Sequence, residues 1–305
     1  MELAIMIEGQ NGLTWPRWQR LARHVEDLGF VGLYRSDHFT NANPPDIDSL
    51  EMWTSFTWLA SHTQRLEFGP LVTPASFRHP VFTARMAKDV DDLSGGRFQL
   101  GVGAGWQVRE HGMFGFDLLD VKGRMDRFAE SLEVITRLLH SDQPVSYQGQ
   151  YYRLHEAVLL PRPQRPGGPP IVIGGNGRRR TLPLAARYAD EWNAVFLPTD
   201  KLVELNAYLD ELARAQGREP SAIRRSLMTG TVFGRDDAEV QRKLGSRSAD
   251  ELRARGMLVG TPGEFVAQLG RIAETPVYRV MLQWLDLDDL AGLEVLAREV
   301  MRQVR

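Results

Sequence analysis

Cysteine is absent from this 305-residue chain, which excludes disulfide bonds, thiolate metal sites and a cysteine nucleophile. Long apolar runs are absent too, since no segment approaches the ~20 residues that span a membrane. The formal net charge of -2 gives no electrostatic basis for binding nucleic acid or an anionic membrane surface. Residues 1–10 carry a short apolar run without a basic region before it, so we expect a buried strand and not a signal peptide. These absences predict a cytoplasmic globular protein with neither nucleic acid nor membrane as a partner.

Short apolar runs alternate with longer amphipathic segments along almost the whole chain. Eight such pairs in succession predict an α/β fold, a (β/α)8 TIM barrel formed by residues 1–305 as a single domain. An open doubly wound sheet is the alternative, although it usually has fewer units. We expect strands at residues 3–7, 31–34, 66–72, 98–102, 171–173, 192–196, 226–233 and 277–285. We expect helices at residues 15–28, 52–61, 80–93, 124–139, 182–188, 201–216, 238–244 and 290–304.

Two stretches lengthen this repeat. Residues 147–170, which come after strand four and its helix, have the pattern of a hairpin followed by a connection rich in proline and glycine. Residues 245–263 extend the connection between strands seven and eight. We interpret both stretches as insertions into one domain.

The residues that follow each apolar run are the candidate functional residues, because active sites of (β/α)8 barrels lie at the C-terminal ends of the strands. These residues are small, polar or aromatic, whereas the strand bodies are rich in valine, isoleucine and leucine. Such a pattern is typical of a ligand-binding mouth above a packed core. The set, in chain order, is Glu8, Ser36, Asp37, His38, Pro70, Leu71, Val72, Thr73, Gly103, Ala104, Gly105, Trp106, Gly174, Gly175, Asn176, Gly177, Arg178, Asn193 and Gln283.

Asp37 and His38 are adjacent at the end of the second predicted strand. Histidine carries protons near neutral pH, and a neighbouring carboxylate can orient it, so the pair is a candidate general acid and base. The alternative is that Asp37 caps a turn while His38 packs against Phe39. The other histidines lack the spacing of a metal site, so we expect no metal. No G-x-S-x-G motif supports a serine nucleophile.

Two glycine-rich segments are candidate binding loops. In GGNGRRR (174–180), backbone amides at a helix start and three arginines would attract an anion such as phosphate. An ordinary turn with exposed basic residues fits this segment equally well. The segment GVGAGW (101–106) is not a dinucleotide fingerprint, because Trp106 replaces its third glycine. Its glycines favour a close approach of the backbone to something flat.

Several segments, taken in their order and spacing, resemble the bacterial luciferase-like family of flavin and deazaflavin oxidoreductases. The matching segments are SDHF (36–39), GPLVTP (69–74), SGGRFQLGVGAGW (94–106), PPIVIGGNG (169–177) and AARYADEWN (185–193). The resemblance extends over nearly the whole chain. It implies the same (β/α)8 barrel, with FMN or the deazaflavin coenzyme F-420 bound in the barrel mouth.

The resemblance also implies roles for the candidate residues. Asp37 and His38 would lie beside the reactive edge of the cofactor ring, with His38 as proton donor or acceptor and Asp37 orienting His38 or the ring. The third strand would bulge at Pro70 and Leu71, often with a non-prolyl cis peptide, and would back the ring together with Val72 and Thr73. The ring edge, ribityl chain and phosphate would be held by Gly103, Ala104, Gly105, Trp106, Gly174, Gly175, Asn176, Gly177 and Arg178. On the substrate side, the resemblance implies Glu8, Trp106 and a cover or border formed by residues 147–170.

The choice of cofactor separates the functions that the family contains. SDHF together with GVGAGW is more similar to the deazaflavin branch, which implies hydride transfer between coenzyme F-420 and a small organic substrate. FMN would instead imply a monooxygenase that uses oxygen and reduced flavin from a partner flavin reductase. A non-catalytic flavin-binding barrel is the third alternative. We expect the loops at residues 40–50, 107–123 and 147–170 to select the substrate, and family members are often homodimers.

Overall fold

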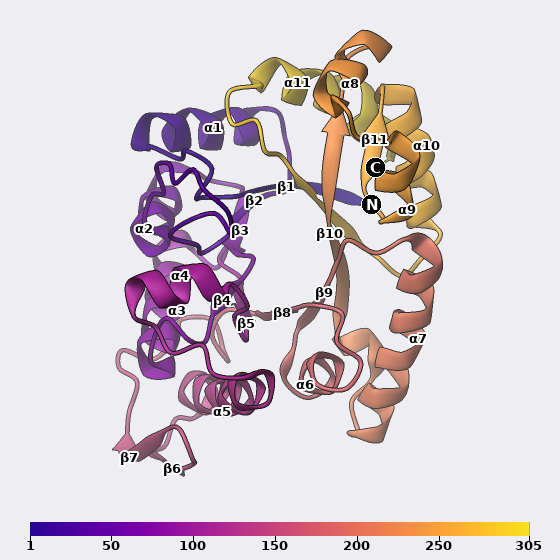
Figure 1. Ribbon diagram of the computed structural model, residues 1–305. Coiled ribbons are helices and arrows are strands. Elements are labelled where there is room, and N and C mark those ends of the chain that lie inside the picture. Colours follow the sequence, from indigo (N-terminus) through magenta and orange to yellow (C-terminus); the bar gives the residue numbers. More distant parts are fainter. Residues whose placement is uncertain (305) are drawn as a thin grey trace.

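Parallel strands form a barrel at the centre of the molecule, and helices cover its outside (Figure 1). The computed structural model describes residues 1–304. The barrel is built from β1 (Glu2–Ile7), β2 (Gly32–Arg35), β3 (Glu67–Pro70), β4 (Thr73–Pro74), β5 (Leu100–Gly103), β8 (Ile171–Gly174), β9 (Glu191–Val195), β10 (Arg224–Phe233) and β12 (Arg279–Gln283). Each predicted strand is present, with ends that differ by a few residues from the prediction.

The sheet returns on itself through its third strand, which is split into two halves. Its order is β3-β2-β1-β12-β10-β9-β8-β5-β4, so β3 pairs with β2 while β4 pairs with β5. The peptide between Leu71 and Val72, which joins the two halves, is cis. A parallel bridge between Phe68 and Phe98 joins β3 to the segment before β5. Counting β3 and β4 as one strand, the sheet is an eight-stranded barrel, which confirms the predicted (β/α)8 class.

The outer helices start and stop where local signals predict. In α3, for example, Pro80 occupies the first turn and Gly95 follows the last turn in the left-handed conformation (φ 69°), as expected for helix ends. The helices are α1 (Trp15–Asp27), α2 (Met52–His62), α3 (Pro80–Ser94), α4 (Val108–Phe114), α5 (Val121–His140), α6 (Thr181–Tyr188), α7 (Thr199–Ala215), α8 (Asp237–Leu244), α9 (Ala249–Ala254), α10 (Pro262–Ala273), α11 (Leu290–Val295) and α12 (Arg302–Val304). A 3-10 turn covers Pro220–Ala222, and a π-helix covers Leu296–Met301. Helices α4, α9 and α10 add to the predicted set.

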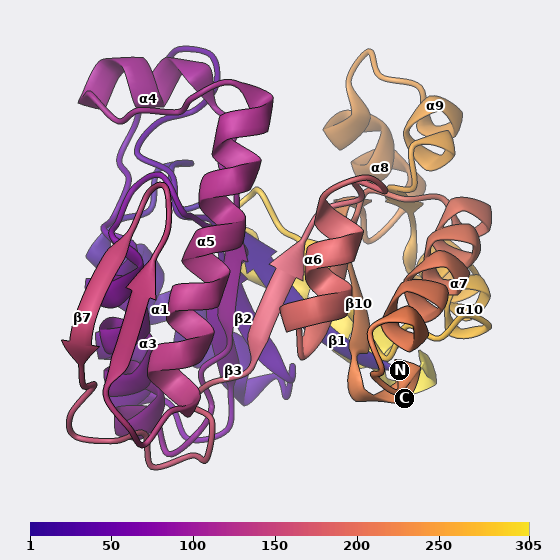
Figure 2. The ribbon, with the colours of Figure 1, turned by 90° about the horizontal axis from the view of Figure 1, so that it is seen from below.

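The first predicted insertion is a hairpin in the predicted place along the chain, between α5 and β8. Strands β6 (Val145–Gln148) and β7 (Arg153–Ala157) pair antiparallel and run beside α5 on the outside of the barrel (Figure 2). The Glu130 carboxylate of α5 accepts hydrogen bonds from the N–H groups of Gln150 and Tyr151, which holds the hairpin tip against the helix. The tip also reaches the start of α3, where the Tyr152 and His79 rings meet edge to face with their centroids 5.0 Å apart. The expected cover or border on the substrate side stays a prediction.

The second insertion lies at the end of the barrel where the strands have their C-termini. It contains α9 and β11 (Leu258–Gly260), and β11 pairs parallel with the end of β10. Helices α8 and α9 project from the same end of the barrel as α4, as Figure 2 shows. The loops that can vary around a ligand therefore gather at this end.

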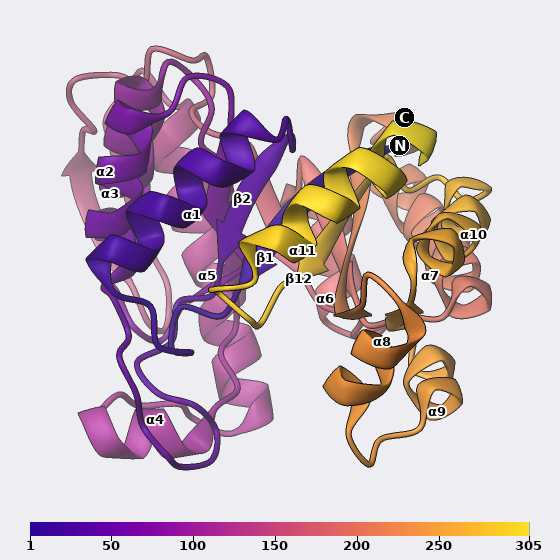
Figure 3. The same cartoon turned by 90° about the horizontal axis from the view of Figure 1, so that it is seen from above.

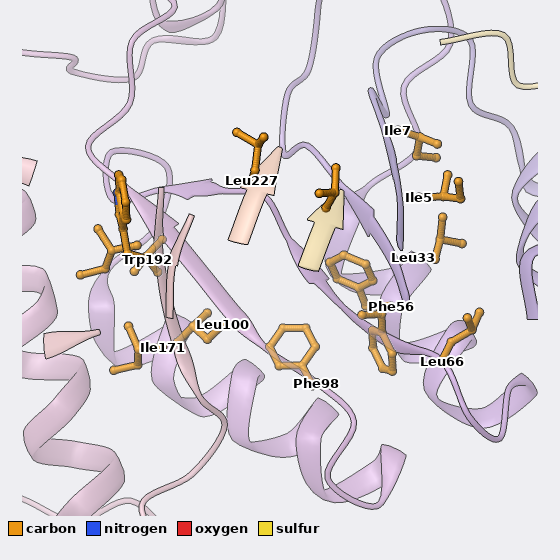
Figure 4. Packing of buried hydrophobic residues seen from close by; sticks show 14 of the residues in the cluster. Ile5, Ile7, Leu33, Phe56, Leu66, Phe98, Leu100, Ile171, Trp192 and Leu227 are labelled. Carbon is orange, nitrogen blue, oxygen red and sulfur yellow. The ribbon is translucent and has the colours of Figure 1, made fainter. Parts of the chain in front are cut away.

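The main apolar core lies between the barrel strands and the outer helices (Figure 4). Phe56 and Phe98, for example, meet edge to face with their ring centroids 5.8 Å apart. The two chain ends lie side by side at the end of the barrel opposite α8 and α9 (Figure 3), where the Met1 amino group donates to the Val304 carbonyl. No helix within residues 1–304 is long and apolar enough to cross a membrane.

Candidate active site

A cavity of about 620 Å³ opens at the C-terminal ends of the strands. All eight barrel strands, or the residues directly after them, contribute to its wall, and α5 adds one further side. The wall is largely apolar, with a small set of polar groups that point inward. Its lining residues include Met6, Glu8, Ser36, His38, Leu71, Val72, Gly103, Ala104, Gly105, Trp106, Gln107, Arg124, Met125, Gly174, Gly175, Thr181, Asn193, Met228 and Gln283.

His38 and Glu110 form a buried pair in this wall. His38 follows β2 and Glu110 lies on α4, and the His38 Nδ1 is 2.7 Å from the Glu110 Oε1. The Glu110 side chain is fully buried, and its other carboxylate oxygen accepts the Phe39 N–H at 3.0 Å. Burial lowers the pKa of His38, but the hydrogen bond and charge of Glu110, together with Glu8 and Asp37, outweigh it and raise that pKa above 6.5. Since Nδ1 faces the carboxylate, Nε2 is the nitrogen that can exchange a proton with a ligand.

The loop after β5 is fixed against His38 by its own hydrogen bonds. Trp106 meets His38 edge to face, with ring centroids 5.8 Å apart. The Gln107 amide donates to the Thr40 carbonyl at 3.0 Å. The Gln107 carbonyl accepts from His111 Nδ1 at 2.7 Å, so the His111 Nε2 is the acceptor for the Ser76 hydroxyl at 2.7 Å. This chain of bonds sets the position of Trp106 at the cavity mouth.

The Glu8 carboxylate is held at the cavity wall by two amides. Gln283 donates to its Oε1 at 2.7 Å, and Gln10 donates to its Oε2 at 3.0 Å. The Ser36 hydroxyl donates to the Gln10 amide oxygen, which fixes the direction of that amide. Glu8 therefore presents a positioned negative charge to a molecule in the cavity.

Val72 forms part of the cavity floor and explains two glycines. A Cβ at Gly103 would lie 2.6 Å from the Val72 Cγ2, and a Cβ at Gly174 would lie 3.1 Å from the Val72 Cγ1. The side chain of Val72 thus occupies the space that those two residues leave open. The structure therefore gives these two glycines a packing reason, and the sequence-based interpretation, in which Gly103 allows a flat ligand to approach the backbone, stays a prediction.

Arg124 and Thr181 also line the cavity. Arg124, near the start of α5, is the one lysine or arginine of residues 1–304 that lines the cavity. No ion pair to Arg124 occurs among the described side chains. Thr181 begins α6, and its hydroxyl would lie 2.8 Å from a Cβ placed at Gly177. A guanidinium and a hydroxyl beside a helix start are a donor set suited to a phosphate group.

Of the nineteen candidate residues, the structure places thirteen in the cavity wall: Glu8, Ser36, His38, Leu71, Val72, Gly103, Ala104, Gly105, Trp106, Gly174, Gly175, Asn193 and Gln283. The other six, which are Asp37, Pro70, Thr73, Asn176, Gly177 and Arg178, are not part of the lining. Asn176 uses its amide to bond the N–H and carbonyl of Val195, so it joins the loop after β8 to β9. Arg178 pairs with Glu204 and covers the Tyr208 ring on the surface.

Asp37 is turned away from the cavity. Its carboxylate accepts the Thr73 hydroxyl at 2.7 Å and forms an ion pair with Arg78. Arg78 also reaches Glu51 at the start of α2. Asp37 therefore ties the loop after β2 to β4, while His38, the next residue, takes the position in the wall. The predicted partnership of Asp37 with His38 is replaced by that of Glu110 with His38.

A sequence profile of the luciferase-like monooxygenase family matches residues 1–274. The chain belongs to this luciferase-like family. The predicted family is thereby confirmed.

Relatives of this luciferase-like chain include both dehydrogenases and monooxygenases. It is 29% identical over 276 residues to an F420-dependent hydroxymycolic acid dehydrogenase of Mycobacterium tuberculosis, which covers 88% of the chain and 72% of the relative. It is 33% identical over 202 residues to a 4-hydroxyprotoasukamycin monooxygenase of Streptomyces nodosus subsp. asukaensis, which covers 66% of the chain and 52% of the relative. The chain thus spans about half to three quarters of the length of these relatives.

A solved structure supports the fold over the full length. An F420-dependent secondary alcohol dehydrogenase in complex with an F420-acetone adduct superposes on the luciferase-like chain with a TM-score of 0.85, 21% identity and full coverage of both chains. At this identity, the likeness confirms the barrel fold alone. All three relatives are oxidoreductases by name, the class of enzyme predicted from the sequence.

Three functional residues escaped the sequence-based prediction. Glu110 lies 72 positions from His38 on a short helix inside a stretch expected to be a loop, and no periodic pattern connects them. Gln107 follows the Trp106 motif directly, but nothing marks its side chain as buried beside His38. Arg124 carried a usable signal, because it was predicted to begin the helix after strand four, where a first-turn cation faces the catalytic end of a barrel.

Proposed function

We propose that this chain is an oxidoreductase that transfers a hydride between coenzyme F-420 and an alcohol or carbonyl carbon of a small organic substrate. The observation that carries the proposal is the His38–Glu110 pair inside the cavity. Hydride transfer at such a carbon must be accompanied by proton transfer at its oxygen, and His38 supplies a group for that proton. The F420-dependent dehydrogenase that matches 88% of the chain supports the choice of cofactor.

The residues of the cavity fit a deazaflavin. Val72 and Leu71 offer an apolar surface for a flat ring, and Gly103 and Gly174 leave room for the Val72 side chain in that surface. Arg124 and Thr181 would hold the phosphate, which explains a cavity-facing cation without a protein partner. Coenzyme F-420, when bound, supplies a carbon centre that accepts or releases a hydride.

The chain's own residues would then perform the acid–base part of the reaction. In the direction of alcohol oxidation, His38 Nε2 takes the hydroxyl proton, and Glu110 stabilises the imidazolium through Nδ1. In the reverse direction, Nε2 returns that proton to the carbonyl oxygen. Trp106 packs against the His38 ring and limits the access of water to it. Glu8 accepts a hydrogen bond from a donor group of the substrate.

An FMN-dependent monooxygenase is the second candidate. It is supported by the 33% identity to 4-hydroxyprotoasukamycin monooxygenase. The same cavity fits FMN, which also carries a flat ring and a phosphate. In that case a flavin reductase would be a partner of the chain.

Parallel titrations of the purified chain with coenzyme F-420 and with FMN, followed by ligand fluorescence, would separate the two candidates. We expect coenzyme F-420 to bind at least about tenfold more tightly, a difference of about 1.4 kcal/mol. Tight binding of FMN without binding of coenzyme F-420 would reverse the order of the candidates. Binding of neither would contradict both.

A variant then tests the role of the proton carrier. His38→Ala should leave the affinity for coenzyme F-420 nearly unchanged and reduce turnover of secondary alcohols by about 10²- to 10⁴-fold. Unchanged turnover would exclude His38 from the proton transfer.

A further inference from the structure

Asn193, on the inner face of β9, has a buried amide oxygen without a partner. Its side chain is fully buried and lines the cavity. Its Nδ2 donates to the Ser226 hydroxyl at 2.8 Å and lies near the Met281 sulfur. Its Oδ1 is among the buried atoms of residues 1–304 that have no hydrogen-bond partner. A buried acceptor in this state costs free energy unless a ligand completes it.

A relay of hydrogen bonds below the cavity fixes the direction of this amide. The Glu191 carboxylate accepts from the Ser226 hydroxyl and from the Tyr278 hydroxyl. Because Ser226 has one proton and gives it to Glu191, its oxygen must accept from Asn193. The nitrogen of the Asn193 amide therefore donates to Ser226. The amide oxygen of this cavity-lining side chain is the atom that has no hydrogen-bond partner.

Asn193 also stands opposite His38. In the closed strand order, β9 is four strands away from β2 in either direction. A ligand between the two sides would meet the proton carrier at one end and the Asn193 acceptor at the other. Glu8 is a second acceptor, but it already receives two amide hydrogen bonds.

We propose that Asn193 Oδ1 accepts a hydrogen bond from an N–H or O–H group of the molecule bound in the cavity. The donor has two sources, an N–H of the cofactor ring or a hydroxyl of the substrate. The proposal deepens the proposed function, on which it rests for the identity of the two ligands. It assigns Asn193 as a binding residue that orients a ligand by its polar edge.

The test compares Asn193→Leu with a matched control, Asn206→Leu. Asn206 is also a buried asparagine with an unpartnered Oδ1, but it lies on α7 away from the cavity, and its Nδ2 bonds the Leu202 carbonyl. Each variant is titrated with coenzyme F-420 and with FMN in the absence of substrate, and then assayed for KM and kcat with secondary alcohols. Thermal unfolding shows that each variant is folded.

If an N–H of the cofactor ring is the donor to Asn193 Oδ1, Asn193→Leu weakens cofactor binding about tenfold, and Asn206→Leu does not. For a substrate donor, cofactor binding is unchanged and KM rises about tenfold. If neither quantity changes by more than about twofold, the proposal is overturned. Wild-type chain that binds neither cofactor contradicts the proposed function instead, so the two failures are distinct.

Ser226→Ala provides a second test that changes no cavity-lining side chain. It removes the group that orients the Asn193 amide. Whichever of cofactor affinity or KM is impaired in Asn193→Leu should therefore also be impaired in Ser226→Ala, by a smaller factor of about threefold. If Asn193→Leu does not fold, this variant decides: unchanged cofactor affinity and unchanged KM would overturn the proposal.

Discussion

Glu110→Gln removes the negative charge beside His38 while nearly preserving the size of the side chain. In the wild-type chain, Glu110 raises the pKa of His38 against the opposing effect of burial. The variant should lower that pKa, because burial then acts against a weaker attraction. Alcohol oxidation requires neutral His38, so the acidic limb of the profile of kcat/KM against pH should move to lower pH. In the reductive direction, which requires protonated His38, the loss of activity at high pH should also move to lower pH.

The magnitude follows from the geometry of the pair. The two atoms are 2.7 Å apart and both side chains are largely buried. Opposite charges whose centres are about 4 Å apart attract by about 4 kcal/mol at an effective dielectric constant of about 20, which is a ceiling for the effect of removing the charge. Since the glutamine amide keeps a polar contact and Glu8 and Asp37 remain, the pKa of His38 should fall by less than this ceiling allows.

NMR titration of the His38 ring protons without cofactor measures the pKa directly, and steady-state kinetics across pH measure its effect on turnover. The matched control is Glu239→Gln, which neutralises a buried carboxylate of α8 outside the cavity wall. Glu110 acts through His38, so it is a positioning residue. If His38 titrates at the same pH in the wild type and in Glu110→Gln, the charge of Glu110 does not set the proton affinity and the reasoning fails.

Two further changes test the walls of the cavity. Arg124→Ala should weaken cofactor binding about 10- to 100-fold, because a charge-assisted bond to phosphate is lost. Arg178→Ala should leave cofactor affinity unchanged in the same titration. The reverse result would place the phosphate at Arg178, as predicted from the sequence. Gly103→Ala should lower the free energy of unfolding by about 1–3 kcal/mol through overpacking against Val72, as measured by urea denaturation. Adding Val72→Ala should recover part of that loss, and strictly additive effects of the two changes would contradict the packing role.

The fold was predictable because its signals are local and repeated. Each barrel strand is a short apolar run, and most outer helices have an amphipathic face and recognisable ends, so their number and order follow from the sequence. The hairpin at β6 and β7 was predicted as a hairpin after strand four and its helix, which is its place between α5 and β8. Its contacts with Glu130 of α5 could not be predicted, because they arise only through tertiary packing.

The site was predictable only as far as strand ends determine it. His38, Glu8 and Trp106 lie in the wall because they follow β2, β1 and β5 closely. Asp37 has the same sequence signal as His38, yet successive residues of an extended segment point to opposite sides, and Thr73 and Arg78 take up its carboxylate. Glu110 comes from a different unit of the barrel, and its contact with His38 arises only through tertiary packing.

Because His38 and Asn193 lie on opposite sides of the barrel, the width of the barrel sets the distance between them. Strand number and tilt determine the diameter of a closed sheet, and loops attached to its rim do not alter that width. Evolution could therefore exchange the rim segments α8 and α9 to admit new molecules, while α4, which carries Glu110, and the span across the floor stay constant. Such an enzyme would conserve the distance between His38 and Asn193 rather than the shape of the cavity rim. The barrel would then reject molecules whose polar edge lies at a different distance from the reacting atom.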